Sequence, residues 1–222
     1  MGFKNWAKTL VGTTLALMAT KGTVTKGEDS FPVHGDIGFI QPVTRDPYGS
    51  YAEGNFSYKL PGVEGFTFMD FYTNEGAGYC GRTSLDKTLI ADSIGPRVQA
   101  YHYNEPFSEG GVGIGIKIPS LPKDVFAKVN IMPVWINKEG KYDGKRAMID
   151  YCFSMPLPKQ FTLSGFGGWN LAKGSTWDYG EFELSRPIYK NIKLGIGTAL
   201  ESRGDRKALP EVAGRITLRV TF

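Results

Sequence analysis

The 222-residue chain contains no run of about 18 consecutive apolar residues, so the sequence predicts no membrane-spanning helix. It has two cysteines, Cys80 and Cys152, and lacks any Cys-x-x-Cys or Cys/His cluster. A disulfide between these two residues stays open, because sequence alone does not show that the thiols meet. The two histidines, His34 and His102, lie in no zinc or hydrolase motif, and we expect neither a metal nor a cofactor.

The charge of the chain gives no sign of a nucleic-acid partner. The formal net charge is +4, but Lys4, Lys8, Lys21 and Lys26 all precede the first acidic residue, Glu28. The rest of the chain is therefore balanced, whereas binding to nucleic acid needs a basic patch on the folded domain. We expect no nucleic acid among the partners.

Glycine and aromatic residues are abundant instead. The chain has 29 glycines, its aromatic content is 13%, and its mean hydropathy is slightly negative. This mixture is typical of an all-β protein in which apolar and polar positions alternate. A membrane barrel has the same composition, because half of its strand residues face a wet interior.

The last eight residues, 215–222, alternate without a break. Apolar side chains occupy every even position, and the odd positions include Arg215 and Arg219. A strand sends successive side chains to opposite faces, so one face is apolar and the other basic. The run resembles the closing strand of bacterial outer-membrane proteins, whose final Phe, here Phe222, belongs to the assembly signal. The resemblance implies outer-membrane lipid and the barrel-assembly machinery as partners.

Similar alternation recurs from about residue 51, with turn-forming residues between the runs. We therefore predict an antiparallel transmembrane β-barrel of about ten strands (8–12) over residues 51–222, in a bacterial outer membrane. Residues 1–26 have a basic start and an apolar stretch, as in a signal peptide or a retained N-terminal helix. Residues 27–50 are expected to form a linker or plug, and residues 79–92 a long loop. The expected strands lie within 52–60, 66–72, 97–101, 112–118, 125–131, 146–155, 161–170, 177–185, 192–201 and 215–222.

A soluble barrel that holds a small apolar ligand is the alternative fold. It would turn the same apolar faces inward and the charged faces to water. The expected strands of roughly 9–12 residues suit a tilted membrane strand better than a globular one, which has about 5–6 residues.

In a membrane barrel the polar strand faces line the lumen. These faces carry more basic than acidic groups, so the sequence predicts a lumen that favours anions or solutes with a negative dipole end. The alternative is that the charges pair with one another and fill a narrow interior. The candidate lumen residues are Lys59, Arg97, Lys117, Lys128, Arg146, Lys193, Arg215 and Arg219, against Glu53, Asp150 and Glu201, with Glu181 and Glu183 on a strand whose inward face is ambiguous.

Residues 65–72, the stretch 81–86 and Pro96-Arg97 are similar to the nucleoside-specific (Tsx-like) channel family. In that family an aromatic-Asp-aromatic early strand is followed by a long excursion and a strand that opens in Pro-Arg. The resemblance implies that aromatic faces stack a base while charged groups hold its polar edge. The candidate solute contacts are Phe68, Asp70, Phe71, Tyr72 and Arg97.

The function expected from these patterns is passive passage or binding of small polar solutes, nucleoside-like or anionic. A lipid-modifying barrel enzyme is the other alternative. It would need a nucleophile, a base and an acid together at the membrane rim, and Ser108, His102 and Glu105 are close in sequence. Because no hydrolase motif surrounds them, an enzyme is the weaker hypothesis.

Overall fold

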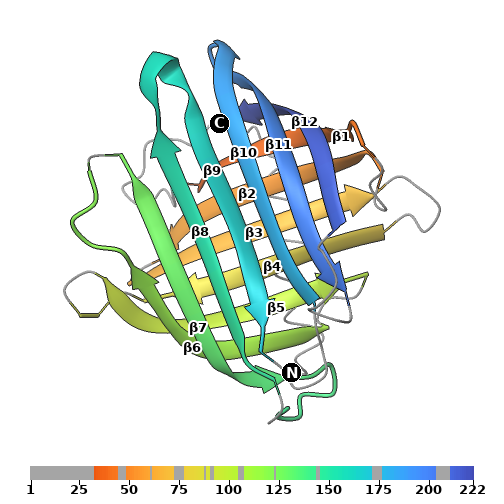
Figure 1. The fold of residues 1–222 in the computed structure, drawn as a ribbon. Helices are drawn as coiled ribbons and strands as arrows, with labels where there is room; N and C mark the ends of the chain where they lie inside the picture. Colours follow the sequence, from red (N-terminus) through yellow and green to blue (C-terminus); the bar gives the residue numbers. More distant parts are fainter. Residues whose placement is uncertain are drawn as a thin grey trace, which may run out of the picture.

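The structure, a computed structural model, describes residues 33–44, 49–60, 62–72, 78–87, 89–90, 93–104, 108–122, 124–143, 146–171, 177–203 and 211–222. Within these described residues, twelve antiparallel strands form one closed barrel (Figure 1). They are β1 (Val33–Pro42), β2 (Tyr51–Leu60), β3 (Val63–Tyr72), β4 (Gly78–Asp86), β5 (Ile94–Tyr103), β6 (Glu109–Lys117), β7 (Phe126–Ile136), β8 (Met148–Pro156), β9 (Thr162–Asn170), β10 (Trp177–Tyr189), β11 (Ile192–Arg203) and β12 (Glu211–Thr221).

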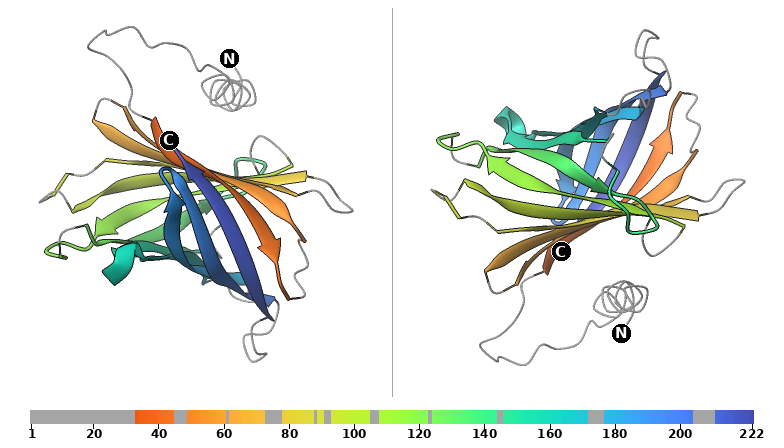
Figure 2. Two further views of the ribbon diagram at one scale, coloured as in Figure 1. Left: turned by 90° about the horizontal axis from the view of Figure 1, so that it is seen from above. Right: turned by 90° about the horizontal axis from the view of Figure 1, so that it is seen from below.

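Each strand pairs with its neighbours in the sequence, and β12 closes the barrel by pairing with β1. The closing register runs from Asp36 opposite Thr221 to Pro42 opposite Arg215. Figure 2 shows the sheet curling until β1 and β12 lie side by side. Closure leaves no strand at an open edge, so the backbone N–H and C=O groups of every strand can form hydrogen bonds with a neighbouring strand. A strand needs these hydrogen bonds to cross a membrane. In Figure 1 the near strands β8–β12 cross the far strands β1–β5 obliquely, the strand tilt that a closed barrel requires.

Two of the twelve strands lie where the sequence predicted none, so the estimate of about ten is corrected. β1 occupies part of the segment expected to be a linker or plug, and β4 replaces most of the loop expected at 79–92. Both strands carry glycine or threonine on the outward face, where a strong alternation needs large apolar groups, for example Gly35, Gly81 and Thr83. The barrel therefore begins at Val33, and the segment 1–26 lies outside the described residues.

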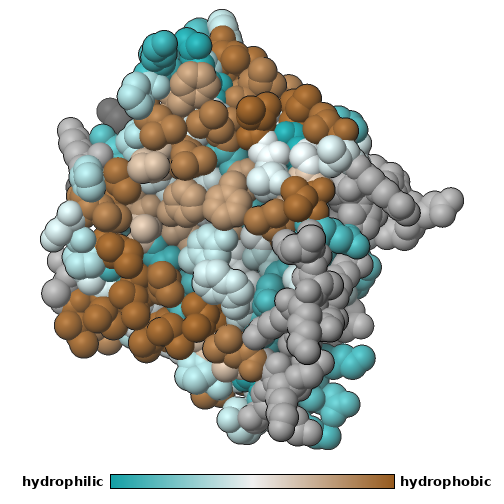
Figure 3. Space-filling view, in the orientation of Figure 1, coloured by the Kyte–Doolittle hydropathy of each residue, from teal (hydrophilic) through white to brown (hydrophobic). Residues whose placement is uncertain are grey.

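Apolar side chains point outward from the barrel and polar ones point inward. On β12, Ile216, Leu218 and Val220 are 42%, 43% and 41% exposed, whereas Arg215 is buried at 5%. The near face of the molecule, over β7–β11, shows mostly apolar side chains (Figure 3). A soluble barrel would have the opposite arrangement, so that alternative is wrong. Among the described residues, no helix is long and apolar enough to cross a membrane.

The inward and outward faces of β7 exchange at a bulge. Val112 and Ile114 of β6 pair with Val134 and Ile131, so two residues of β7 stand opposite one residue of β6. One of the two is Pro133, a residue that sheets accept at bulges because it has no N–H to donate. As a result Met132 and Trp135, of opposite parity, are both buried inside the barrel, at 0% and 1% exposure.

The two ends of the barrel differ in their connections. At one end, here called the terminal end, β1 begins, β12 ends, and the turns at 61–62 and 190–191 are short. The opposite end, here called the loop end, carries the longest connection, 137–147. The stretch 187–189, beyond the strand predicted at 177–185, is the last part of β10.

Candidate binding site in the barrel lumen

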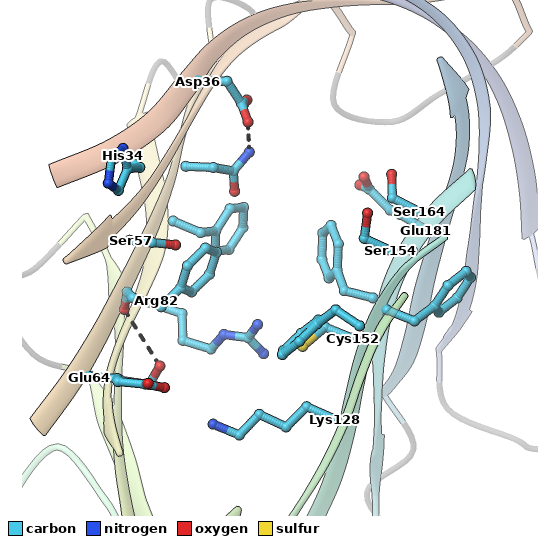
Figure 4. A pocket seen from close by; sticks show the side chains of 18 of the residues that line it. His34, Asp36, Ser57, Glu64, Arg82, Lys128, Cys152, Ser154, Ser164 and Glu181 are labelled. Carbon is cyan, nitrogen blue, oxygen red and sulfur yellow. Dashed lines mark hydrogen bonds between the residues drawn. The ribbon is translucent and has the colours of Figure 1, made fainter. Parts of the chain in front are cut away.

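The lumen contains two cavities that meet near its middle. The large cavity, about 800 Å³, opens toward the terminal end, and the small cavity, about 280 Å³, lies toward the loop end. Phe68, Arg82 and Phe166 line both cavities. Figure 4 shows the large cavity, with Arg82 and Lys128 reaching into it from opposite walls.

The boundary between the cavities is aromatic on one side and ionic on the other. The ring centroids of Phe68 and Phe166 are 5.8 Å apart, at an angle of 54°. Arg82 Nη1 lies 3.5 Å from Asp150 Oδ2, and Asn130 donates a second hydrogen bond to the Asp150 carboxylate. We call Phe68, Phe166, Arg82 and Asp150 the constriction. Alternation brings these side chains inward, and pairing of β3 with β4 and of β8 with β9 puts them at one level.

The wall of the large cavity carries ion pairs that run around the barrel. Asp86 accepts from Arg97 Nη1 at 2.6 Å, and its second oxygen lies 2.6 Å from Lys128 Nζ. Arg97 also donates to the side-chain oxygen of Gln99. Nearer the rim, Lys117 donates to Glu64 at 2.6 Å. These residues come from β3, β4, β5, β6 and β7, so the pairs link five consecutive strands.

A second cluster joins the strands that close the barrel. Arg219 of β12 contacts Asp36 of β1 (3.1 Å), Glu53 of β2 (2.5 Å) and Glu183 of β10 (2.9 Å). Arg215, two residues earlier on the same face, donates to Glu181 and at 2.7 Å to the hydroxyl of Tyr51. Both guanidiniums are paired with carboxylates from strands one or two positions away in the sheet, which compensates their charges in the lumen.

At the loop end, Arg146 is paired as well. It donates to Glu109, and its guanidinium lies 4.9 Å from the centre of the Trp135 ring. The indole packs over Gly111, where a Cβ would lie 2.7 Å from the ring.

The sequence-based prediction of a basic, anion-favouring lumen did not account for these ion pairs. Six of the eight basic candidates have a carboxylate partner, and the other two, Lys59 and Lys193, line the large cavity. The structure shows the pairing that the alternative expected, but the side chains do not fill the interior, since two cavities remain. The pairs are Arg97–Asp86, Lys128–Asp86, Lys117–Glu64, Arg146–Glu109, Arg215–Glu181 and Arg219–Glu53.

The five candidate solute contacts do not form one site. Phe68, Asp70 and Tyr72 point inward, but Phe71 points outward and is 42% exposed, so its expected place in the lumen is wrong. Arg97 lines the large cavity, whereas Asp70 and Tyr72 line the small one. The structure also adds two aromatic residues that the sequence did not place in the lumen, Phe166 and Tyr179, whose rings lie 6.1 Å apart. Their inward parity on β9 and β10 was the available signal.

The cysteines are free thiols, so the disulfide considered from the sequence is not formed. Cys80 lies beside the small cavity, with its sulfur 3.2 Å from the Tyr72 hydroxyl. Cys152 lines the large cavity. Within the described ranges, no three His, Cys, Asp or Glu side chains are grouped as a metal site requires.

Of the three residues considered for a lipid-modifying enzyme, the structure describes His102 and Ser108. His102 is buried, at 7% exposure. In the sequence of β5 it stands between Tyr101 and Tyr103, which line the small cavity. The hydroxyl of Ser108 accepts a hydrogen bond from the backbone N–H of Tyr103 at 3.0 Å. Glu105 lies outside the described residues.

The barrel has an apolar exterior and a polar, ion-paired interior, and its antiparallel strands are 9 to 13 residues long. These features together are those of a transmembrane β-barrel. The protein is an outer-membrane β-barrel. No family model matches the chain, and no curated protein matches it either.

Three outer-membrane barrels are among the solved structures that are similar to this chain. The carbohydrate-binding barrel Wzi of Escherichia coli, an outer-membrane protein involved in group 1 capsule assembly, matches over 84% of this chain with 8% identity and a TM-score of 0.40. The chain spans 55% of the length of that protein. A mutant porin of Rhodopseudomonas blastica matches over 87% of this chain and 100% of its own, with 7% identity and a TM-score of 0.39.

The β domain of the Bordetella autotransporter BrkA matches over 86% of this chain and 98% of its own, with 12% identity and a TM-score of 0.37. Because every one of these TM-scores lies below 0.5, the likenesses do not bear on what this protein binds.

Proposed function

We propose that this barrel admits small polar solutes into its lumen in a bacterial outer membrane and binds or passes them there. One observation carries the proposal: two solute-sized cavities, about 800 and 280 Å³, meet at a constriction shared by both. A solid barrel filled by side chains would not leave such space. Short turns are typical of the periplasmic side and longer loops of the extracellular side, so the terminal end would face the periplasm.

The paired charges of the lumen favour neutral or zwitterionic solutes. Fixed acids and bases that alternate around a pore wall offer hydrogen bonds to both ends of a polar solute without a net field of one sign. The pore would therefore conduct small ions weakly and select little between anions and cations. Bulk transport of anions is not the role that this wall supports.

A nucleoside is the finer candidate for the solute. Phe68 and Phe166 present two ring faces at the constriction, and aromatic faces bind bases by stacking. Arg82 and Asp150 lie at the same level and provide donors and acceptors for the edge of a base or for ribose hydroxyls. This arrangement supports a nucleoside better than it supports a bare sugar, which has no ring face to stack.

Reconstitution in planar bilayers tests the proposal. We expect a small conductance with weak ion selectivity, and reversible block when uridine is added but not when ribose is added. Phe166→Ala should abolish the block by uridine while leaving the protein folded and conducting. Absence of any conductance or solute flux in correctly inserted protein would contradict the channel, and equal block by ribose would contradict the nucleoside.

A further inference from the structure

The small cavity differs from the large one in the balance of its charges. Asp70 lines it and is buried at 5% exposure. Its Oδ2 accepts from the Tyr72 hydroxyl at 3.2 Å and lies 3.8 Å from the Cys80 sulfur, while Oδ1 has no hydrogen-bond partner. Among the described residues, no basic side chain forms an ion pair with Asp70.

The two arginines that line the same cavity already have partners. Arg82 is paired with Asp150, and Arg215 is paired with Glu181. Asp70 is therefore, within the described part of the chain, a carboxyl on this wall that forms no ion pair, although Arg215 lines the same cavity. A buried, uncompensated carboxylate is costly, and either a proton or a bound cation can neutralise it.

Aromatic rings form most of the rest of the small cavity. Tyr51 and Tyr72 have ring centroids 5.4 Å apart, and Tyr101 and Tyr103 are stacked at 6.1 Å with an interplanar angle of 13°. Tyr179 and the two rings of the constriction complete the wall. The faces of such rings attract a cation that has lost part of its water, and quaternary ammonium groups are the cations most often bound in this way.

From this combination we infer that the small cavity is a binding site for a small organic cation of the ammonium class, held by Asp70 and the surrounding tyrosines. A cavity of about 280 Å³ suits a solute of a few carbon atoms rather than a drug-sized molecule. The inference rests on the proposed solute-binding role of the lumen and names the class of solute at its loop end. An anionic solute is disfavoured here because it would meet Asp70.

Calorimetric titration of the full chain in detergent micelles tests the inference. The probes are choline and its uncharged isostere 3,3-dimethylbutan-1-ol, compared at pH 8, where protons compete least for a carboxyl. We expect choline to bind and the neutral alcohol to bind at least about tenfold more weakly, since the two molecules differ by one charge. Equal binding of the two, or no binding of choline by folded protein, would overturn the inference.

Variants locate the site. Asp70→Asn removes the charge without changing the shape and should weaken choline binding about tenfold or more. Tyr103→Leu removes one ring of the cage and should weaken it as well. Glu64→Gln, which removes an equal charge from the large cavity, is the matched control and should leave the affinity unchanged. The same affinity in Asp70→Asn as in the unaltered protein would place choline elsewhere and overturn the inference.

The bilayer measurement separates this inference from the proposed function. A protein that conducts but does not bind choline overturns the cation site alone. A protein that binds choline and loses this binding in Asp70→Asn, yet shows no conductance, supports the site and contradicts passage through the lumen.

Discussion

Arg219 of β12 and Glu53 of β2 are 166 positions apart in the chain, and their side chains meet at 2.5 Å inside the barrel, across β1. Glu53 is almost fully buried, with its side chain 1% exposed. The pair therefore spans the joint at which the sheet closes on itself. Asp36 and Glu183 accept from the same guanidinium, so one arginine holds together strands from both ends of the chain.

Replacing Arg219 by Gln should destabilise the barrel strongly. The change leaves three carboxylates facing one another in a buried place, and breaking a buried ion pair by removing one partner typically costs about 3–5 kcal/mol. Urea unfolding of the reconstituted protein, followed by tryptophan fluorescence, measures the change in the free energy of unfolding. Lys141→Gln is the matched control: it breaks a pair with Glu139 whose side chains are 75% and 57% exposed, and should cost at most about 1 kcal/mol. A similar loss in both variants would contradict the role of the closing cluster.

Widening the constriction should raise conductance. Phe68→Ala removes one of the two rings that separate the cavities, so the single-channel conductance in planar bilayers should rise severalfold with no change of the weak ion selectivity. Phe39→Ala is the control, since it makes the same change on the outer surface, where the side chain is 52% exposed. An unchanged conductance in Phe68→Ala would mean that the two cavities are not joined at this ring.

Reducing agents should leave the stability of the protein unchanged. Cys80 and Cys152 are free and lie beside different cavities, so no covalent link is there to break. Thermal unfolding with and without dithiothreitol should coincide, and the double variant Cys80→Ser/Cys152→Ser should migrate like the parent on a non-reducing gel. A faster-migrating form that disappears on reduction would show that the thiols do pair.

The sequence predicted which side chains of a strand point outward better than it predicted which charged side chains meet inside the barrel. Where large apolar and charged residues alternate, as at Leu194 and Ile196 of β11, the outward face followed directly from parity. In β1 and β4 the contrast between apolar and polar positions is weak, because glycines such as Gly38 and Gly81 occupy strand positions. The sequence analysis therefore missed both strands. The same parity, applied to β3, would have placed Phe71 on the outer surface, opposite to Asp70 and Tyr72.

Ion pairs could not be predicted in this way, for a physical reason. Alternation fixes the face on which a charge lies, but its partner depends on strand order and register, which are properties of the closed sheet. Arg146 and Glu109 are 37 positions apart and meet because β6, β7 and β8 are adjacent. Counting the charges on each strand therefore suggested a basic lumen, whereas the folded wall is paired.

Placing an arginine on the outer surface tests the membrane assignment itself. Ile196 lies near the middle of β11 and is 61% exposed, so in water Ile196→Arg would change the stability little. In a bilayer the same residue faces hydrocarbon, and an arginine near the midplane should cost about 2–4 kcal/mol. Unfolding in urea from phospholipid vesicles measures the difference.

The matched control for this test is Val212→Arg. Val212 is equally exposed, at 60%, but it is the second residue of β12 and lies near the loop end of the barrel, where the cost should fall to about 0–1 kcal/mol. A large penalty at 196 and a small one at 212 is the depth dependence that a bilayer imposes and that water does not. Equal, small effects at both positions would mean that water surrounds the strands, and the lumen would then lose its role as a path across a membrane.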